Sequence, residues 1–451
     1  MKKNNTFIRN TINISLAFAW ISVFTSVFDA LIQIIATAPV ADGGLGFYST
    51  GKGVIMALDN ILALFLLPLF GILSDRSRSR FGRRTPYILV FSIAAVVTWT
   101  LAGATLGLDS KWIFLILLGV TLSFNAMARP AALSLLPDVT PLSLRRKANA
   151  VTQIVSIIAT VVGIGLCELK AVIGFQWIFM IDSAIMAVLI IIFAVTVREN
   201  KLVKEYNALP EVEKGADSET ETFDFNVNRE NLFRNKLLLL SAVFFFYVAF
   251  NGLVSSLSVY AEKVLVGLDK GGFTIPQLLC LVAACAAAVP VSKLSKKIKR
   301  RKLLITGLLI MLAAFVLAGL QRSLNAFMFI SFLLAGGGYS VALVNLYPYV
   351  LELSDQNKIG FNTGLFNTVM TVAMVLTPIA SGWLQDKLGY TVLFPYCIVA
   401  LAISVLFLLF IKDAKTKAQP VGAQEAQTVD KPAIEISDDG DSGEYISSIL
   451  K

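Results

Sequence analysis

Four charged side chains stand inside long apolar stretches of the sequence. They are Asp29, Asp59, Arg129 and Asp182. A charge at the centre of a bilayer costs about 2.5–3.5 kcal/mol on insertion scales, so such a residue normally faces a water-filled cavity or a partner. The chain has no histidine, so any proton exchange near neutral pH must use carboxylates. These four residues are candidates for coupling a cation, with a structural ion pair or a position near the membrane surface as the alternative.

Neutral polar and aromatic residues form a second candidate set, because an uncharged polar ligand needs neutral donors, acceptors and an aromatic face. Interhelical hydrogen bonding or packing is the alternative for each of them. The charged candidates all fall in the first half of the chain, so we predict cation chemistry there and neutral contacts in the second half. The set is Trp20, Gln33, Asn60, Asn125, Gln153, Tyr247, Asn251, Asn345, Tyr347, Asn362 and Asn367.

The elements that must position these residues are membrane-spanning helices. The chain has 451 residues, of which 56% are hydrophobic and 15% charged, whereas about a quarter of a soluble protein is charged. A spanning helix needs about 20 apolar residues, and the runs here are too long for barrel strands. The fold class predicted is an all-α membrane protein with twelve spans in two six-helix bundles. The spans are predicted at 12–37, 53–73, 87–107, 112–135, 148–167, 176–197, 236–260, 274–294, 303–321, 325–350, 360–384 and 391–411.

Polar segments divide the chain into an N-terminal bundle (1–197), a cytoplasmic linker (198–235), a C-terminal bundle (236–411) and a disordered cytoplasmic tail (412–451). Most lysines and arginines fall on the side of the membrane that holds the N-terminus, so both termini are predicted to be cytoplasmic. The net charge of +9 therefore reflects topology rather than nucleic-acid binding. The first apolar run is too long for a signal peptide, so it is predicted to be a retained span.

Few motifs for cofactors or catalysis are present. The four cysteines lie in or beside apolar runs without a CxxC pair, so no metal site or other cofactor is expected. Residues 46–53 approach a P-loop, but Gly53 stands where that motif needs Ser or Thr, which argues against ATP as the energy source. No nucleophile–base pair is evident, so the protein is not expected to be an enzyme.

Residues 71–84, which end the second predicted span and follow it, carry a motif of charged residues and glycines. A membrane anchor explains its arginines but not the glycines and the aspartate among them. A glycine can allow close helix approach, and Asp75 can sit at a helix N-terminus, where the macrodipole favours an anion. We therefore predict a latch that breaks and reforms, and a weaker one at 292–301, which keeps only the positive charge. The predicted latch residues are Gly71, Asp75, Arg76, Gly82, Arg83 and Arg84.

This stretch resembles the loop 2–3 signature of the major facilitator superfamily. The spacing from Asp75 to Gly82 is similar to the glycoside–pentoside–hexuronide:cation symporter branch, and further motifs resemble its sucrose and disaccharide proton-symporter group. Two aspartates of the melibiose group's sodium site would fall near Ala63 and Leu67, so sodium is the less expected cation. The further motifs are Asp59-Asn60, the segments 136–141 and 145–149, Asn345 to Pro348, the segment 360–364, and Gly382 to Asp386.

The resemblance implies a major facilitator fold whose two bundles rock around a central cavity to give alternating access. It implies uptake of a disaccharide or other glycoside together with a proton, in the plasma membrane, without a cofactor. A buried carboxylate would carry the proton, and its protonation would weaken its pairing with Arg129. Two alternatives remain, namely export of a drug, lipid or other small molecule by the same fold, and a transport-inactive receptor or sensor. The expected partners are the sugar, the proton and the bilayer, with the protein as a monomer.

Overall fold

The computed structural model describes residues 2–77, 79–106, 111–207, 232–266, 272–295, 297–353 and 359–411. Within these ranges the chain is helical apart from turns, loops and an isolated bridge between Val266 and Ser323. Twelve of the described helical segments are long and apolar enough to cross a membrane. The predicted fold class is therefore confirmed.

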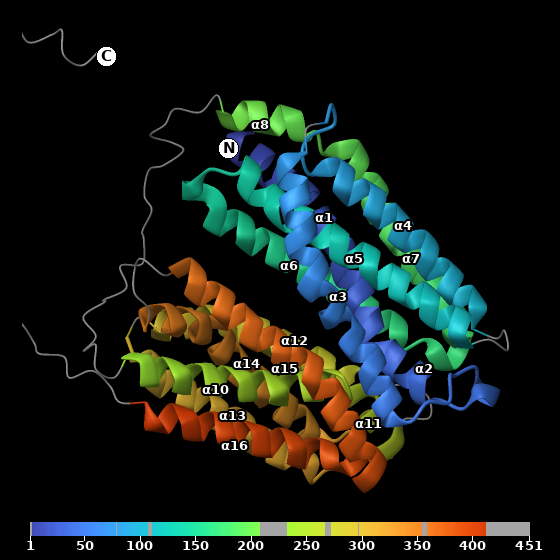
Figure 1. Ribbon diagram of the computed structural model, residues 1–451, viewed down its shortest axis with the longest axis vertical. Coiled ribbons are helices and arrows are strands. Elements are labelled where there is room, and N and C mark those ends of the chain that lie inside the picture. Colours follow the sequence, from blue (N-terminus) through green and yellow to red (C-terminus); the bar gives the residue numbers. More distant parts are fainter. Residues whose placement is uncertain are drawn as a thin grey trace, which may run out of the picture. The chain divides into compact units, whose positions relative to one another are not determined.

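The first half contributes six spans (Figure 1), and the first of them is interrupted by a π-helical turn. A short 3-10 turn, η2 (Val40–Asp42), follows this span. The first span consists of α1 (Lys2–Val27), η1 (Phe28–Ile32) and α2 (Gln33–Thr37), and the others are α3 (Ser49–Arg76), α4 (Thr85–Thr105), α5 (Lys111–Val139), α6 (Leu142–Cys167) and α7 (Lys170–Thr196).

The second half follows a short helix, α8 (Glu199–Asn207), and its first and last spans carry short extra helices. Its elements are α10 (Leu232–Val254), α11 (Leu257–Val264), α12 (Ile275–Ser295), α13 (Arg300–Gly319), α14 (Ala326–Glu352), α15 (Ile359–Leu388), η5 (Tyr390–Val392) and α16 (Leu393–Phe410).

The two halves repeat one packing scheme. In the first half, α1 packs on α6 and α7, α3 packs on α5, and α4 packs on α5 and α7. In the second half, α10 packs on α15 and α16, α12 on α14, and α13 on α14 and α16. A shift of six spans converts the first set of pairs into the second, as expected for two related bundles.

A glycine contact recurs at corresponding positions of the two bundles. A Cβ added to Gly103 of α4 would lie 2.3 Å from Phe179 Cβ of α7. A Cβ added to Gly319 of α13 would lie 3.0 Å from Phe394 Cβ of α16. Small residues allow membrane helices to approach closely. A glycine therefore stands where α4 meets α7 in the first bundle and where α13 meets α16 in the second.

The outer surfaces of the spans are strongly apolar, with large side chains such as Phe65, Val90, Ile116 and Phe410 exposed. Apolar surface on this scale is rare on soluble monomers, whereas lipid tails solvate it without cost. Trp99 and its neighbours Phe24 and Phe179 are instead fully buried within the first bundle. Both distributions fit helices that cross a membrane.

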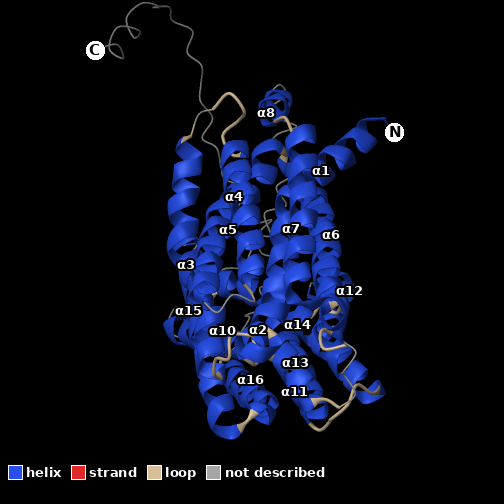
Figure 2. Ribbon diagram, turned by 90° about the vertical axis from the view of Figure 1, so that its right-hand side faces the viewer, coloured by secondary structure: helices blue, strands red, loops and turns tan. Residues whose placement is uncertain are grey.

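The two ends of the spans differ. We call the end that holds the start of α1 and α8 the linker end (Figure 2), and the end that holds α2, α11 and the facing parts of α3 and α15 the seam end. The predicted solvated linker begins with the helix α8, whose first residue, Glu199, is buried. Residues 208–231 and the predicted disordered tail 412–451 lie outside the described residues.

Candidate functional site

Asp29 occupies an irregular turn in the second half of the first span. It lies in the π-helix η1, and all four of the other residues of η1 are buried, whereas Asp29 is half-buried. Single π-helical turns inside α-helices are rare and occur frequently at functional sites. The π-helical turn therefore holds Asp29, which the sequence predicts as a candidate for cation coupling.

Asp29, Asp59 and Arg129 form a charged cluster on three different helices. Asp29 lies within electrostatic range of both Asp59 on α3 and Arg129 on α5. All three side chains are half-buried, and within the described part of the chain none makes a side-chain hydrogen bond or ion pair. Two carboxylates and one guanidinium thus share a region without being tied to one another, so a proton or a ligand can change their pairing.

Asn125 extends this cluster along α5. It lies one helical turn before Arg129, so the two share a face of the helix. Its side chain is 1% exposed, and neither its amide oxygen nor its amide nitrogen has a partner among the described residues. A buried amide without partners is costly, which makes Asn125 a candidate for a hydrogen bond to a bound ligand. Asn60, next to Asp59, is half-buried.

Asp182 does not belong to the charged cluster. It is fully buried between α7 and α4, where one carboxylate oxygen accepts a hydrogen bond of 2.8 Å from Trp99 Nε1. The other oxygen has no partner among the described residues. The four charged candidates therefore separate into a group of three and a fourth residue inside the bundle.

In the second half, three aromatic rings gather from three helices. The ring of Phe366 on α15 lies 6.4 Å from Tyr247 on α10 and 5.4 Å from Tyr347 on α14, between centroids. The hydroxyl of Tyr347 is 3.0 Å from Thr363 Oγ1. Sequence reasoning selected the two tyrosines but missed Phe366, because a phenylalanine inside an apolar span carries no distinguishing signal.

Three of the four asparagine candidates in the second half are hydrogen-bonded to other groups of the protein. Asn251 donates to the carbonyl of Met374 at 2.7 Å, and Asn345 donates to the carbonyl of Val341 at 2.9 Å. Asn362 accepts a hydrogen bond from Lys236. Asn367 is instead exposed on α15. In this conformation the first three asparagines are thus hydrogen-bonded within the protein.

Two first-half candidates lie in contrasting surroundings. Trp20 is fully buried in the hydrophobic core, and its indole N–H has no partner among the described residues. Gln153 is exposed and lines a pocket of 260 Å³ between α1, α5 and α6. In this conformation the ring of Trp20 is packed away from any ligand, whereas Gln153 is accessible.

Gln33 joins the two halves of the chain at the seam end. Its side-chain amide donates to the carbonyl of Val254 at 3.1 Å and accepts from the backbone N–H of Val259 at 3.3 Å. The side chain is fully buried. This substrate candidate therefore acts here as a contact between α2 and the α10–α11 turn.

Asp386 on α15 caps the first turn of α3. Its carboxylate accepts the backbone N–H groups of Ser49 at 2.7 Å and Thr50 at 2.8 Å. The free N–H groups and the macrodipole of a helix N-terminus favour an anion. The cap is unusual because the carboxylate comes from the other half of the chain.

Glu168 makes the equivalent cap on the opposite pair of helices. Its carboxylate, at the end of α6, accepts the backbone N–H of Thr274 at 2.7 Å and that of Gly272, at the start of α12. A shift of six spans relates α6 to α15 and α3 to α12, so the two caps occupy corresponding places in the two halves. An ion pair of 2.6 Å between Lys170 and Glu262 lies beside the second cap.

Lys52 is a buried cation within the same seam. It is 0% exposed, and its Nζ donates to Ser256 Oγ at 2.8 Å and to Gln385 Oε1 at 2.9 Å, both in the second half. The sequence alone does not single it out, because the run around it stands out only as an incomplete P-loop. Lysine is almost never fully buried without a partner, and that rarity was the available signal.

Two glycines allow α3 and α15 to touch along their backbones. A Cβ on Gly53 would lie 2.1 Å from the carbonyl oxygen of Pro378, and one on Gly382 would lie 2.2 Å from that of Ser49. Neither position tolerates a side chain in this arrangement. The hydrogen bonds and ion pairs that join described residues of the two halves all lie at the seam end, so the two halves are locked together there.

The predicted latch residues form an ionic cluster at the linker end. Arg84 pairs with Asp75 and with Asp138, the latter at 2.9 Å, while Arg83 pairs with Asp138 at 2.7 Å. The hydrogen bond that Arg83 donates to Asp138 raises the pKa of Arg83 above its ordinary value. Asp75 lies in the last turn of its own helix, α3, and its partner Arg84 directly precedes the first residue of α4.

Glu199 of α8 completes this cluster and was missed. It accepts the backbone N–H groups of Arg83 at 2.7 Å, Arg84 at 3.0 Å and Thr85 at 2.8 Å, at the start of α4. Gly82 has a φ of +118°, and a Cβ there would overlap Glu199. The sequence had placed Glu199 in a solvated linker, so nothing local connected it with the loop.

The remaining latch residues contribute less in this conformation. A Cβ on Gly71 would lie 3.8 Å from Pro130, an ordinary contact, and Arg76 is exposed. In the second half, Arg300 pairs with Glu352, and Arg301 donates to the carbonyls of Leu408 and Leu409. The carboxylate that the 292–301 motif lacks is thus supplied by the end of α14, as Asp138 supplies one from α5.

These features define a class of protein: a twelve-helix membrane protein of two related bundles, with a charged cluster in one half and hydrogen-bonded contacts between the halves at one end. The Major Facilitator Superfamily model matches residues 19–288 and 267–442, and the chain belongs to that family. It is also similar to the uncharacterized MFS-type transporter YttB of Bacillus subtilis (strain 168). The two are 23% identical over 327 residues, which cover 71% of this chain and 75% of the relative.

Solved structures share the fold. The nucleoside transporter NupG superposes with a TM-score of 0.65 at 12% identity, covering 89% of this chain and 98% of the other. A peptide transporter POT gives 0.68 at 14%, covering 88% and 93%. An inward-facing bacterial homologue of the human lysosomal transporter Spinster gives 0.62 at 14%, covering 90% and 94%. At these identities the likeness shows the fold alone, and the family makes the protein a secondary transporter.

Proposed function

We propose that the protein takes up a sugar, a disaccharide or other glycoside, together with a proton by alternating access. The observation that carries this proposal is the charged cluster of Asp29, Asp59 and Arg129, brought together by three helices and not locked by direct pairing. A transporter that used only neutral contacts would have no reason to bear the cost of placing three charges within its spans.

The cluster supplies the cation chemistry. With one guanidinium for two carboxylates, Arg129 can compensate only one negative charge at a time. A proton taken up by Asp29 or Asp59 removes the other charge, and Arg129 then pairs with the carboxylate that remains ionised. Proton binding and helix position are coupled in this way, because the three groups belong to α1–η1, α3 and α5.

The sugar contacts come from both halves. Tyr247, Tyr347 and Phe366 offer aromatic faces, against which the apolar face of a sugar ring can pack. Asn125, whose amide has no described partner, offers both a donor and an acceptor to hydroxyl groups. A ligand held between these two groups touches both bundles, so its binding favours their approach.

Alternating access requires the seam end to break and reform. The predicted topology puts the linker end in the cytoplasm, in a plasma membrane with both termini inside, so the present conformation is closed to the outside. The polar contacts at the seam are caps, hydrogen bonds and an ion pair, and they lie beside close glycine approaches. Such contacts can be exchanged for water when the bundles rock the other way.

External pH recording tests the proposal directly. De-energised cells that express the protein receive sugars one at a time in weak buffer, with sucrose and maltose first. Transient alkalinisation with one sugar, absent from control cells, is the expected result. No pH signal and no labelled uptake across the panel would favour export or a transport-inactive receptor, whereas uptake without a pH signal would mean a uniporter or another cation.

The cluster itself is tested with Asp29→Asn and Asp59→Asn. Each is expected to reduce proton-driven accumulation at least tenfold while exchange of sugar across the membrane persists. The matched control is Asp42→Asn, which removes an exposed carboxylate from the loop after the first span. If both cluster variants accumulate sugar as the control does, neither aspartate carries the proton.

A further inference from the structure

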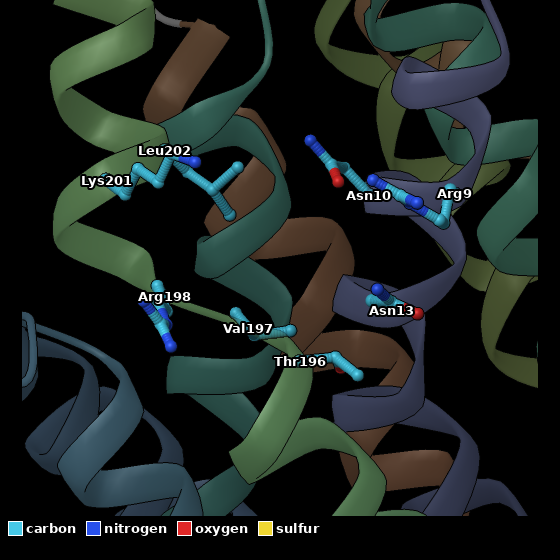
Figure 3. A pocket seen from close by; sticks show the side chains of 8 residues that line it. All are labelled: Arg9, Asn10, Asn13, Thr196, Val197, Arg198, Lys201 and Leu202. Carbon is cyan, nitrogen blue, oxygen red and sulfur yellow. The ribbon is translucent and has the colours of Figure 1, made fainter.

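A pocket of 430 Å³ opens at the linker end of the first bundle, between α1, the end of α7 and α8. In Figure 3 the α1 side chains Arg9, Asn10 and Asn13 face α8 across a floor formed by Thr196 and Val197. Arg198 and Lys201 line the α8 side. The pocket lies far along the spans from the charged cluster and shares no residue with it.

The lining is positively charged and rich in hydrogen-bond donors. Two arginines and a lysine line the pocket, and none of its eight described lining residues is a carboxylate. The amides of Asn10 and Asn13 make no hydrogen bond to a described residue. A phosphate group accepts hydrogen bonds from arginine, lysine and amide N–H groups, which are the donors present here.

The acidic residue next to Arg198 in the chain does not neutralise these charges. Glu199 follows Arg198 directly, but it is buried and its carboxylate already accepts three backbone N–H groups and the Thr85 hydroxyl at the start of α4. Thr196 is likewise occupied, because its hydroxyl donates to the carbonyl of Ile192. The arginines therefore remain the dominant charges of the pocket.

The depth of the pocket matches the level of lipid headgroups. The first apolar span begins at Phe7 and the sixth ends at Thr196, so Arg9 and Thr196 both lie where a span meets water. Buried Val197 and half-buried Leu202 add apolar surface beside the charges. A lipid offers the same combination, a phosphate next to a glycerol backbone and the first acyl carbons.

We propose that this pocket binds the phosphate of an anionic phospholipid headgroup from the adjoining leaflet. Bound there, the lipid bridges α1 to α8. Because α8 holds the α3–α4 loop through Glu199, the lipid would also secure the ionic cluster of the linker end. The site is separate from sugar and proton binding, so it stands or falls independently of the proposed transport.

Native mass spectrometry of the purified full-length protein tests this. The probes are phosphatidylglycerol, phosphatidylcholine and inorganic phosphate. Wild type is expected to retain phosphatidylglycerol in preference to phosphatidylcholine, and Arg9→Gln and Arg198→Gln are each expected to weaken that retention about fivefold. The matched control is Lys204→Gln, which removes an exposed charge from α8 outside the pocket and should leave retention unchanged.

Further variants keep the result interpretable. Arg9→Lys retains the charge and is expected to keep most of the lipid binding, and equal thermal unfolding temperatures show that the Gln variants fold. Equal retention of both lipids, or pocket variants that behave like Lys204→Gln, would overturn the proposal. Displacement of phosphatidylglycerol by millimolar inorganic phosphate would also overturn it, because the ligand would then be a soluble phosphate.

Discussion

The seam end and the linker end use similar chemistry for different purposes. At the seam end, the carboxylates of Asp386 and Glu168 cap helices of the opposite half. At the linker end, Asp138 and Glu199 bind arginines and backbone N–H groups within the first half and α8. One end therefore ties the bundles together, and the other stabilises a bundle internally. Changes at the seam should alter the balance between conformations, while changes at the linker end should mainly alter stability.

The largest effect is expected from Gly53→Val. A side chain at this position overlaps the backbone of α15, which cannot move aside without opening the seam. Maleimide labelling of Ser258→Cys, a buried seam residue, should rise at least tenfold above the parent, and uptake should be lost. Gly337→Ala is the control, since a Cβ there meets nothing within 4 Å. Unchanged labelling in Gly53→Val would mean that α3 and α15 do not close the seam.

Lys52→Met should open the seam to a lesser degree. The substitution keeps an unbranched side chain, one heavy atom shorter, but removes two hydrogen bonds to the second half. A hydrogen bond from a charged group contributes about 1.5–3 kcal/mol, so the loss of even one of the two bonds should increase labelling of Ser258→Cys roughly tenfold. Lys263→Met, on the exposed side of α11, is the comparison. A seam that labels no faster than this control would show that Lys52 is only a packing residue.

The two caps should prove equivalent. Asp386→Asn and Glu168→Gln each weaken one helix cap, which is worth about 1 kcal/mol, so each should raise seam labelling about fivefold. The caps share no described partner, so the double variant should show the product of the two effects. Labelling that responds to only one of them would break the correspondence between the halves.

Gly82→Ala should have the smallest effect on the seam. Its φ of +118° and the contact with Glu199 both oppose a side chain, so the unfolding temperature should fall by several degrees. Labelling of Ser258→Cys, in contrast, should match the parent, because the strain lies within the first half and α8. Faster labelling would show that the two ends are coupled, and the comparison between them would then need revision.

Much of the architecture follows from the sequence. Twelve apolar runs of sufficient length determine twelve helices, because backbone groups in lipid must bond within their own segment. The charges that are costly in a bilayer stand out for the same reason, so Asp29, Asp59 and Arg129 could be named without coordinates. The latch arginines were also visible, as a charged run broken by glycine and aspartate.

The tertiary structure alone decided which of these residues meet. In the folded protein Asp182 lies apart from the other three charges, and Gln33 lies in the seam. Lys52, Glu168 and Glu199 form hydrogen bonds with residues distant in sequence. Each of these contacts joins residues far apart in the chain, and helical periodicity carries no information on which helix lies opposite. Apolar length sets what enters the membrane, whereas the pairing of polar groups depends on how the helices pack once they are there.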